Sequence, residues 1–169
     1  MKVILDMVIT VNGVIARKDF TEDFFPKYNW NIFCGIANKI GCLIFGRKTY
    51  EIIKDYRPKD LKNVTKIVVS KSKKFKNQNK FFFVKSPKEA LSIARTLGFK
   101  EILLAGGGNI NSEFMKLNLV DEIFLNVNPV IVNNGINVFG DLNFEHKLKL
   151  LKIKKLRDNI IRIHYKILK

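Results

Sequence analysis

The sequence predicts an α/β protein with a largely parallel sheet and antiparallel strands at its edge. Over most of the chain, short apolar runs alternate with segments whose apolar residues recur at helical spacing, the pattern of β–α–β units. The last apolar runs, residues 147–157 and 160–168, are separated only by a short break at Asp158-Asn159, which predicts a hairpin. With 169 residues, the chain is most simply one domain, residues 1–169, that is long enough to bury a core.

The predicted elements have recognisable boundaries. Residues 2–11 are rich in Val and Ile and end at Asn12-Gly13, a turn signal. A helix is predicted over residues 30–40, and Gly41 ends it. The strongest helix start is Ser86-Pro87-Lys88-Glu89, with Ser as N-cap, Pro at the first helical position and Glu three residues after Ser. Further strands are predicted over residues 14–16, 42–45, 66–69, 81–84, 102–105 and 122–132, short helices after Gly46 and over 109–117, and loops over 18–28 and 56–63.

Composition restricts the class of protein. The chain is 47% hydrophobic and 27% charged, as in ordinary globular proteins, and no apolar run reaches the roughly 18 residues of a membrane helix. Asp6 interrupts the apolar start of the chain, which argues against a signal peptide. Cys34 and Cys42 have no metal-like spacing, so we expect reduced thiols, no metal site and a cytoplasmic protein.

The net charge of +16 has several possible explanations. A positive charge of this size would favour binding to a nucleic acid, a membrane surface or a phosphorylated ligand. A codon bias toward Lys, Asn, Ile and Phe would produce the same charge without any binding role. The cations are spread along the chain, with local excess at residues 71–80 and 147–157. In the second segment they alternate with Leu and Ile, as in a half-buried strand with a solvated face. We therefore expect neither specific nucleic-acid binding nor membrane association.

The chain is organised around Gly106-Gly107-Gly108, which lies where the apolar strand 102–105 ends and a helix begins. The backbone N–H groups of a helix N-terminus have no intrahelical partner and the dipole there is positive, so an anion such as a pyrophosphate suits the place. Glycine permits positive φ and a close approach by a ligand. A tight turn without a ligand would have the same sequence, so other parts of the chain must decide.

Several other predicted strands also end in distinctive residues. Thr10-Val11-Asn12-Gly13 follows the first strand, Gly46-Arg47-Lys48-Thr49 the strand 42–45, and Ser70-Lys71-Ser72 the strand 66–69. The carboxyl ends of parallel strands are where α/β sheets bind ligands. Arg47 can make a bidentate contact to a phosphate, although alone it would be interpreted as a solvated charge. One elongated ligand that uses these strand ends together is a dinucleotide.

The chain resembles the dihydrofolate-reductase-like superfamily in several motifs. These are Asn12-Gly13-x-Ile-Ala, Gly46-Arg-Lys-Thr-Tyr-Glu, Gly106-Gly-Gly, Leu119-Val-Asp-Glu, and Pro129-Val-Ile followed by Asn137-Val-Phe. More narrowly, the chain is similar to the reductase domain of the bifunctional riboflavin-biosynthesis deaminase-reductase. The resemblance implies a three-layer dihydrofolate-reductase-like fold, NADPH as cofactor, a small and phosphorylated substrate, and a homodimer. The basic residues at Arg47 and at 71–74 suit the 2′-phosphate of NADPH.

The resemblance also implies roles for individual residues. Thr10 and Asn12 are candidates for positioning the substrate, and Asn12, Trp30 and Phe33 are candidates for binding it. The phosphates of the cofactor are assigned to residues 47–49 and to the glycine loop with the residues that follow it, 107–110. The adenosine is assigned to Ser70 and Lys71, and the nicotinamide to Val8, Thr10, Ile15 and Ala16. The implied cofactor-binding residues are Val8, Thr10, Ile15, Ala16, Gly46, Arg47, Lys48, Thr49, Ser70, Lys71, Gly106, Gly107, Gly108, Asn109, Ile110 and Glu113.

The chain departs from the family pattern in ways that bear on the substrate. Asn12 replaces the aspartate usual in the riboflavin branch, and the first helix reads Asn29-Trp30-Asn31 without the carboxylate of dihydrofolate reductases. Asp19, Glu22 and Asp23 lie upstream of it. The expected function is hydride transfer from NADPH to a 5-amino-6-(5-phosphoribosylamino)uracil-type riboflavin precursor. Dihydrofolate reductase and a non-catalytic basic binding module are the alternatives; His146 and His164 receive no catalytic role, and no zinc-deaminase motif is present.

Overall fold

The computed structural model describes residues 1–54, 59–72, 74–77, 80–140 and 142–169. Its strands are β1 (Lys2–Thr10), β2 (Val14–Ala16), β3 (Cys42–Gly46), β4 (Thr65–Val69), β5 (Phe81–Val84), β6 (Glu101–Leu104), β7 (Glu122–Asn128), β8 (Ile136–Asn137), β9 (Lys147–Lys155) and β10 (Ile161–Leu168). Its helices are α1 (Lys27–Ile40), α2 (Arg47–Ile53), α3 (Pro87–Thr96) and α4 (Gly108–Lys116), with 3₁₀ turns at η1 (Lys59–Leu61) and η2 (Arg157–Asn159).

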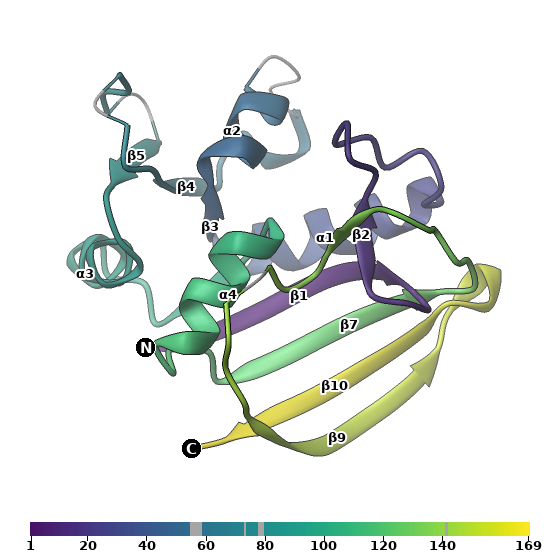
Figure 1. Cartoon of the computed structure of the whole chain (residues 1–169). Helices are drawn as coiled ribbons and strands as arrows, with labels where there is room; N and C mark the ends of the chain where they lie inside the picture. The colour runs from purple at the N-terminus through teal and green to yellow at the C-terminus, as the bar shows by residue number, and fades with distance from the viewer. Residues whose placement is uncertain (55–58, 73, 78–79, 141) are drawn as a thin grey trace.

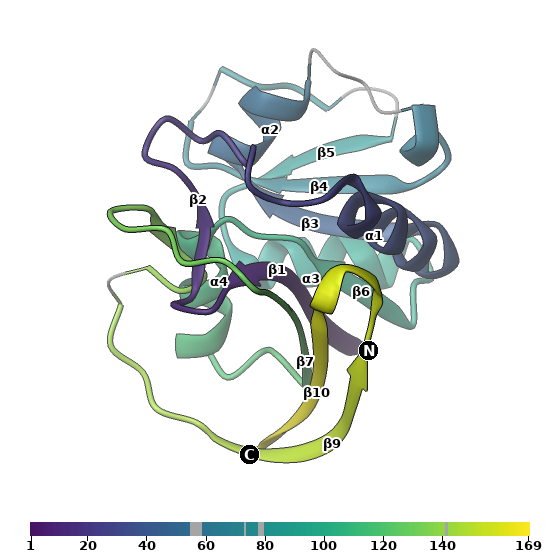
Figure 2. The same ribbon diagram turned by 90° about the vertical axis from the view of Figure 1, so that its right-hand side faces the viewer.

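The main sheet is eight-stranded, in the order β5-β4-β3-β6-β1-β7-β10-β9 (Figures 1 and 2). All neighbours from β5 to β7 pair in parallel, and β10 and β9 add to β7 as an antiparallel hairpin. A small antiparallel sheet of β2 and β8 lies beside the end of β1. The α/β class, the mostly parallel sheet and the antiparallel hairpin are therefore confirmed.

Helices cover both faces of the sheet, which makes the architecture three-layered. Because side chains alternate along a strand, β1 contributes Val3 and Leu5 to the cluster with α3 and α4, and Ile4 to the cluster with α1 and α2. Leu5, Leu103 and Leu104 have no exposed surface. The central strands thus have apolar residues on both faces, as parallel strands between two helical layers require.

Several predicted boundaries hold and others shift. Ser86 caps α3 through a hydrogen bond that its Oγ accepts from the N–H of Glu89 at 3.2 Å. Gly41 ends α1 with a φ of +79°, the left-handed conformation in which glycine is least strained. The strand predicted over 122–132 stops at Asn128 because Pro129 follows, and a proline cannot donate to a strand ladder. The predicted loop 56–63 contains η1, and its residues 56–58 lie outside the described part of the chain.

The connection between β9 and β10 is longer than the predicted break at Asp158-Asn159. The turn η2 spans Arg157–Asn159, and both Asp158 and Asn159 have positive φ. Asp and Asn tolerate this conformation better than other side chains do, which explains their presence. In the described part of the chain, no helix is long and apolar enough to cross a membrane.

Candidate functional site

A cleft of about 670 Å³ opens at the carboxyl ends of the parallel strands. Its walls come from the segment after β3, the segment after β4, the start of α4, and the small sheet of β2 and β8. These segments meet because parallel strands end at the same edge of the sheet. The cleft contains most of the predicted cofactor residues: Ile15, Ala16, Gly46, Arg47, Lys48, Thr49, Ser70, Lys71, Gly107, Gly108, Asn109, Ile110 and Glu113.

The three glycines of the loop have three different environments. Gly106 has a φ of +83°, and a Cβ there would lie 3.1 Å from the Met7 side chain, so the turn itself requires glycine. A Cβ on Gly108 would lie within 2.3 Å of the backbone oxygen of Asn137. Gly107 differs, because its φ is −69° and a Cβ would find only the Thr49 Oγ1, at 3.8 Å. Gly107 is therefore the glycine whose missing side chain leaves space in the cleft.

Helix α4 begins at this loop with its N-terminal groups free of capping side chains. Gly107 is the N-cap and supplies no side chain, and the first turn contains no acidic residue. The backbone N–H groups of a first turn have no partner inside the helix and form the positive end of its dipole. An anion that rests against Gly107 and Gly108 would satisfy them.

Cationic side chains also line the cleft. They are Lys18, Arg47, Lys48, Lys71 and Lys85. Arg47 donates from Nη1 to the carboxylate of Glu51 at 2.8 and 3.0 Å, but both side chains are exposed, so this pair costs little to rearrange. The Lys48 ammonium lies 5.1 Å from the centre of the Phe20 ring. The predicted basic stretch 71–74 includes Lys73, which lies outside the described residues.

Two carboxyl groups, Glu22 and Glu113, also line the cleft. Glu22 keeps part of its surface in water, but neighbouring protein atoms partly desolvate its carboxyl group. Desolvation disfavours the charged form and so raises the pKa of this carboxyl group. A glutamate of this kind retains its proton at a higher pH than an ordinary surface glutamate.

The remaining predicted cofactor residues do not line the cleft. Val8 and Thr10 are on β1, where alternation places Met7 on the cleft side instead. Thr10 is fully buried; its Oγ1 donates to Asn12 Oδ1 at 2.8 Å and accepts from the N–H of Val14 at 2.9 Å. Gly106 contributes its backbone oxygen to a hydrogen bond from the N–H of Gly46 at 2.9 Å.

The predicted substrate-binding residues are also outside the lining of this cleft. The Asn12 amide donates to the Val132 oxygen at 2.9 Å and so ties the first turn to a distant loop. Trp30 donates from Nε1 to Asp60 at 3.1 Å, and its ring centre lies 5.6 Å from that of Phe33. Asn12, Trp30 and Phe33 thus make contacts within the fold, and nothing in the described structure tests whether they touch a substrate.

Sequence reasoning missed other residues of the cleft. Lys85 follows β5 at the same sheet edge as Ser70, so the rule for strand ends could have found it. Lys18 and Phe20 belong to a loop without periodicity, which gives no signal of the direction it takes. The other lining residues that were not predicted are Met7, Glu22, Ile52, Val69, Ala105 and Ile136.

The family model for the RibD C-terminal domain matches residues 1–161. The chain belongs to the RibD C-terminal domain family. This confirms the predicted resemblance, and the match covers both the cleft and all strands of the parallel part of the sheet. No group of His, Cys, Asp and Glu residues in the described part of the chain could hold a metal ion.

Solved structures of several RibD-like proteins and reductases share the fold. A protein assigned to riboflavin biosynthesis from Shewanella sp. PV-4 superposes with a TM-score of 0.85 at 21% identity, covering 100% of both chains. Dihydrofolate reductase from Enterococcus faecalis, complexed with NADP(H) and RAB-propyl, gives a TM-score of 0.77 at 16% identity, and the match covers 99% of this chain and 97% of that one. The deaminase/5-amino-6-(5-phosphoribosylamino)uracil reductase of Thermotoga maritima gives 0.73 at 19%, covering 99% of this chain and 56% of that longer one.

Proposed function

We propose that this RibD-family protein is an NADPH-dependent reductase that transfers hydride to a small heterocyclic substrate of the 5-amino-6-(5-phosphoribosylamino)uracil type. The observation that carries the proposal is the cleft, which brings together the open Gly107 position, the uncapped start of α4 and several cations. The Enterococcus dihydrofolate reductase is complexed with NADP(H), which supports the choice of cofactor. The Thermotoga protein is a 5-amino-6-(5-phosphoribosylamino)uracil reductase, which supports the choice of substrate.

The residues of the cleft fit a phosphorylated dinucleotide. The space above Gly107, which a Cβ would enter, suits a pyrophosphate on the N–H groups of Gly107 and Gly108. Arg47 would contribute charge-assisted hydrogen bonds to the phosphates. Lys71, beside the buried Ser70 at the end of β4, would favour a 2′-phosphate and so NADPH over NADH. Ile15 and Ala16, at the other side of the lining, provide an apolar surface for the nicotinamide.

When bound, NADPH supplies the hydride, and the protein contributes position and a proton. In the proposed reaction, C1 of the ring-opened phosphoribosyl group would be reduced, and the electron pair of its C=N bond would take up one proton at nitrogen. Glu22, a carboxyl group of the cleft whose pKa the surrounding protein raises, is our candidate to hold such a proton. Orientation of the two reactants accounts for the rest of the rate enhancement.

Helix α1 disfavours a pterin substrate relative to a riboflavin precursor. Its first turn contains no acidic residue. Asn29 in that turn is buried and donates from Nδ2 to Asn128 Oδ1 at 2.8 Å. An amide cannot deliver a proton to a pterin ring, so reduction of dihydrofolate would depend on an acid outside α1, such as Glu22.

The decisive experiment measures NADPH oxidation with the phosphoribosylaminopyrimidine and with dihydrofolate, side by side. We expect turnover of the first and little of the second. Turnover of dihydrofolate alone would replace the proposed substrate. Absence of both activities together with absence of NADPH binding would favour a non-catalytic binding module, and tight, salt-sensitive binding to duplex DNA would support that module.

We also propose that the protein is a homodimer in the cytoplasm. The edge strand β9 exposes Leu148, Leu150 and Ile153, which lie on one face because their partners on β10 are Ile167, Tyr165 and Ile163. A second copy covering this face would bury apolar surface that is now in water. Cys34 and Cys42 are buried free thiols, and burial raises their pKa values to about 11 and about 12, as suits a reducing compartment.

A further inference from the structure

A second cavity, of about 360 Å³, lies between α1 and the strands β7, β10 and β9. Helix α1 contributes Tyr28 and Ile32, β7 contributes Phe124, and the remaining wall is formed largely by basic residues of the hairpin. The cavity shares no lining residue with the large cleft. A ligand here would therefore be bound independently of the cofactor.

The strand register places basic residues opposite one another at the cavity. Arg162 on β10 pairs with Lys154 on β9, and His164 pairs with Lys152. All four side chains line the cavity. Like charges directly opposite each other destabilise a strand pair, so the Arg162–Lys154 pair costs stability unless an anion relieves it.

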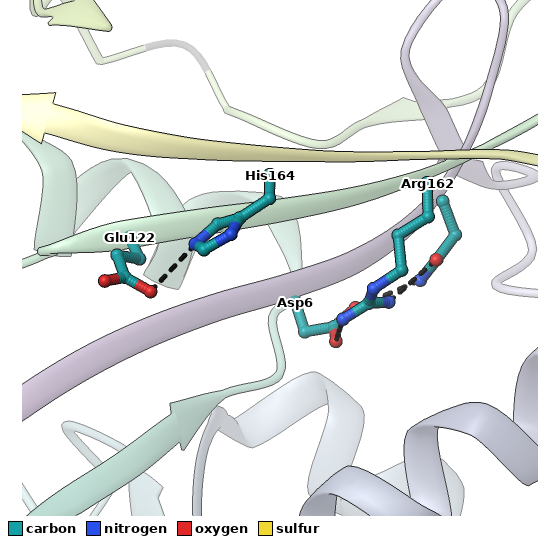
Figure 3. Close-up of polar contacts among 5 residues, drawn as sticks. Asp6, Glu122, Arg162 and His164 are labelled. Atoms are coloured by element: carbon teal, nitrogen blue, oxygen red, sulfur yellow. Dashed lines mark hydrogen bonds and ion pairs between the residues drawn. The ribbon is translucent and has the colours of Figure 1, made fainter. Parts of the chain in front are cut away.

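The β10 members of these pairs have acidic partners inside the protein (Figure 3). Arg162 donates from Nη2 to the buried Asp6 at 2.6 Å and from Nη1 to Asn126 at 2.7 Å. His164 Nε2 lies 2.8 Å from the Glu122 carboxylate. Burial raises the pKa of the Asp6 carboxyl, and the adjacent Arg162 guanidinium opposes that rise. These contacts fix the Arg162 and His164 side chains at the cavity wall.

The β9 members have no such partners. Among the described residues, neither Lys152 nor Lys154 makes an ion pair or a hydrogen bond through its side chain. No Asp or Glu side chain of the described chain lines the cavity. Two ammonium groups thus remain uncompensated at the rim, next to a guanidinium that its own partner holds in place.

The interior of the cavity is aromatic and apolar. The rings of Phe124 and His164 stack, with centres 3.9 Å apart and planes 14° from parallel. The Arg162 guanidinium lies over the Phe124 ring at 4.5 Å. Together with Tyr28 and Ile32, these groups form a surface that suits a flat, conjugated ring. The volume is at the lower end of the range for small-molecule sites, enough for one ring system but not for a dinucleotide.

We propose that this cavity is a second binding site, for a planar aromatic anion whose phosphate or carboxylate pairs with Lys152 and Lys154. The ring lies among Tyr28, Phe124 and His164, and the negative group occupies the rim between the two lysines. The site does not depend on the proposed reductase activity. A ligand of this kind would stabilise the hairpin by relieving the repulsion between β9 and β10.

The experiment titrates the whole protein with 1-naphthyl phosphate by isothermal calorimetry, with the uncharged 1-naphthol as a matched probe. We expect one site for the phosphate and binding at least about tenfold weaker for naphthol, because naphthol lacks the charge-assisted contacts. Saturating NADPH should leave the titration unchanged. Lys152→Ala/Lys154→Ala should weaken phosphate binding by about tenfold or more.

The control is Lys149→Ala/Lys155→Ala, which removes the same charge from the same exposed strand on either side of the cavity residues. We expect the control to change affinity by less than about twofold, since screened charges outside the cavity contribute only weakly. Equal losses of phosphate affinity in both double variants would show that the phosphate responds only to the general positive charge of β9, and would overturn the proposed site. Displacement by NADPH, or absence of binding to the wild-type protein, would overturn it as well. Neither result would bear on whether NADPH itself binds and reacts.

Discussion

Replacing Gly107 with alanine separates the ligand-binding role of the glycine loop from its structural role. The φ of Gly107 is −69°, which alanine adopts without strain, and the new Cβ would find only Thr49 Oγ1 at 3.8 Å. The loss of glycine at an N-cap, about 0.5–1 kcal/mol, is offset by the lower entropy of the unfolded chain, about 0.4–1 kcal/mol. The free energy of unfolding of the apoprotein should therefore change by no more than about 0.5 kcal/mol. The Cβ would instead displace a pyrophosphate, so NADPH affinity should fall at least about tenfold, or about 1.4 kcal/mol.

The assay combines thermal melting of the apoprotein with calorimetric titration of NADPH on the same variants. Gly98→Ala is the matched control, because Gly98 has a φ of +84°, open space within 4 Å of where a Cβ would stand, and a position outside the cleft. It should lose about 1–2 kcal/mol of stability with its NADPH affinity intact. If Gly107→Ala binds NADPH as tightly as the wild type does, the pyrophosphate does not rest on this loop.

Four further predictions concern charge and assembly. Arg47→Ala should weaken NADPH binding by about 1.5–3 kcal/mol in a calorimetric titration, and NADH binding by less if the guanidinium reaches the 2′-phosphate; unchanged NADPH affinity removes this residue from the site. Asp6→Ala should lower the free energy of unfolding by about 3–5 kcal/mol in urea, because Arg162 then loses its buried partner, whereas replacing both residues with leucine should recover most of the loss. Glu22→Gln should flatten the pH profile of NADPH oxidation, which in the wild type should decline as pH rises through the raised pKa of that carboxyl and its proton is lost; an unaltered profile would assign the proton to another group. Ile153→Lys should shift the protein from dimer to monomer in light scattering, and a wild-type monomer would contradict the proposed assembly.

The sequence predicts the parallel part of the fold well because each element has its own local signal. Ser86 caps its helix as expected, and the predicted strands of the parallel sheet are present. The two-residue strand β8 was missed because it has no periodicity of its own. It exists because Gly135 allows the chain to pass against Val14, where a Cβ would lie 2.3 Å from the Val14 side chain. Such a contact between distant segments leaves no pattern in a sequence.

The candidate site was predictable where it depends on strand ends and not where it depends on loops. Gly46, Ser70 and Gly107 meet because their strands are parallel neighbours, which the alternation of strands and helices indicates. Lys18 and Glu22 reach the same cleft through a loop held by the exposed Arg17–Asp23 pair, at 2.7 Å between Nε and Oδ1. Neither the path of that loop nor the raised pKa of Glu22 can be inferred from residue spacing.

The positive charge of the chain acquires a more specific meaning once the register of the last hairpin is known. The alternation of Lys with Leu and Ile in residues 147–157 predicts a half-buried strand with a solvated face. The strand is present, but the half-buried part of the prediction is wrong, because β9 is an edge strand and all of its residues are exposed. A lysine-rich composition alone would scatter cations without regard to their neighbours across the sheet. Here Arg162 faces Lys154, His164 faces Lys152 and Lys166 faces Lys149 in successive pairs of one ladder. The buried Asp6 compensates Arg162, whereas none of the described acidic residues pairs with a lysine of β9, so the excess charge lies where the proposed anion would relieve the repulsion.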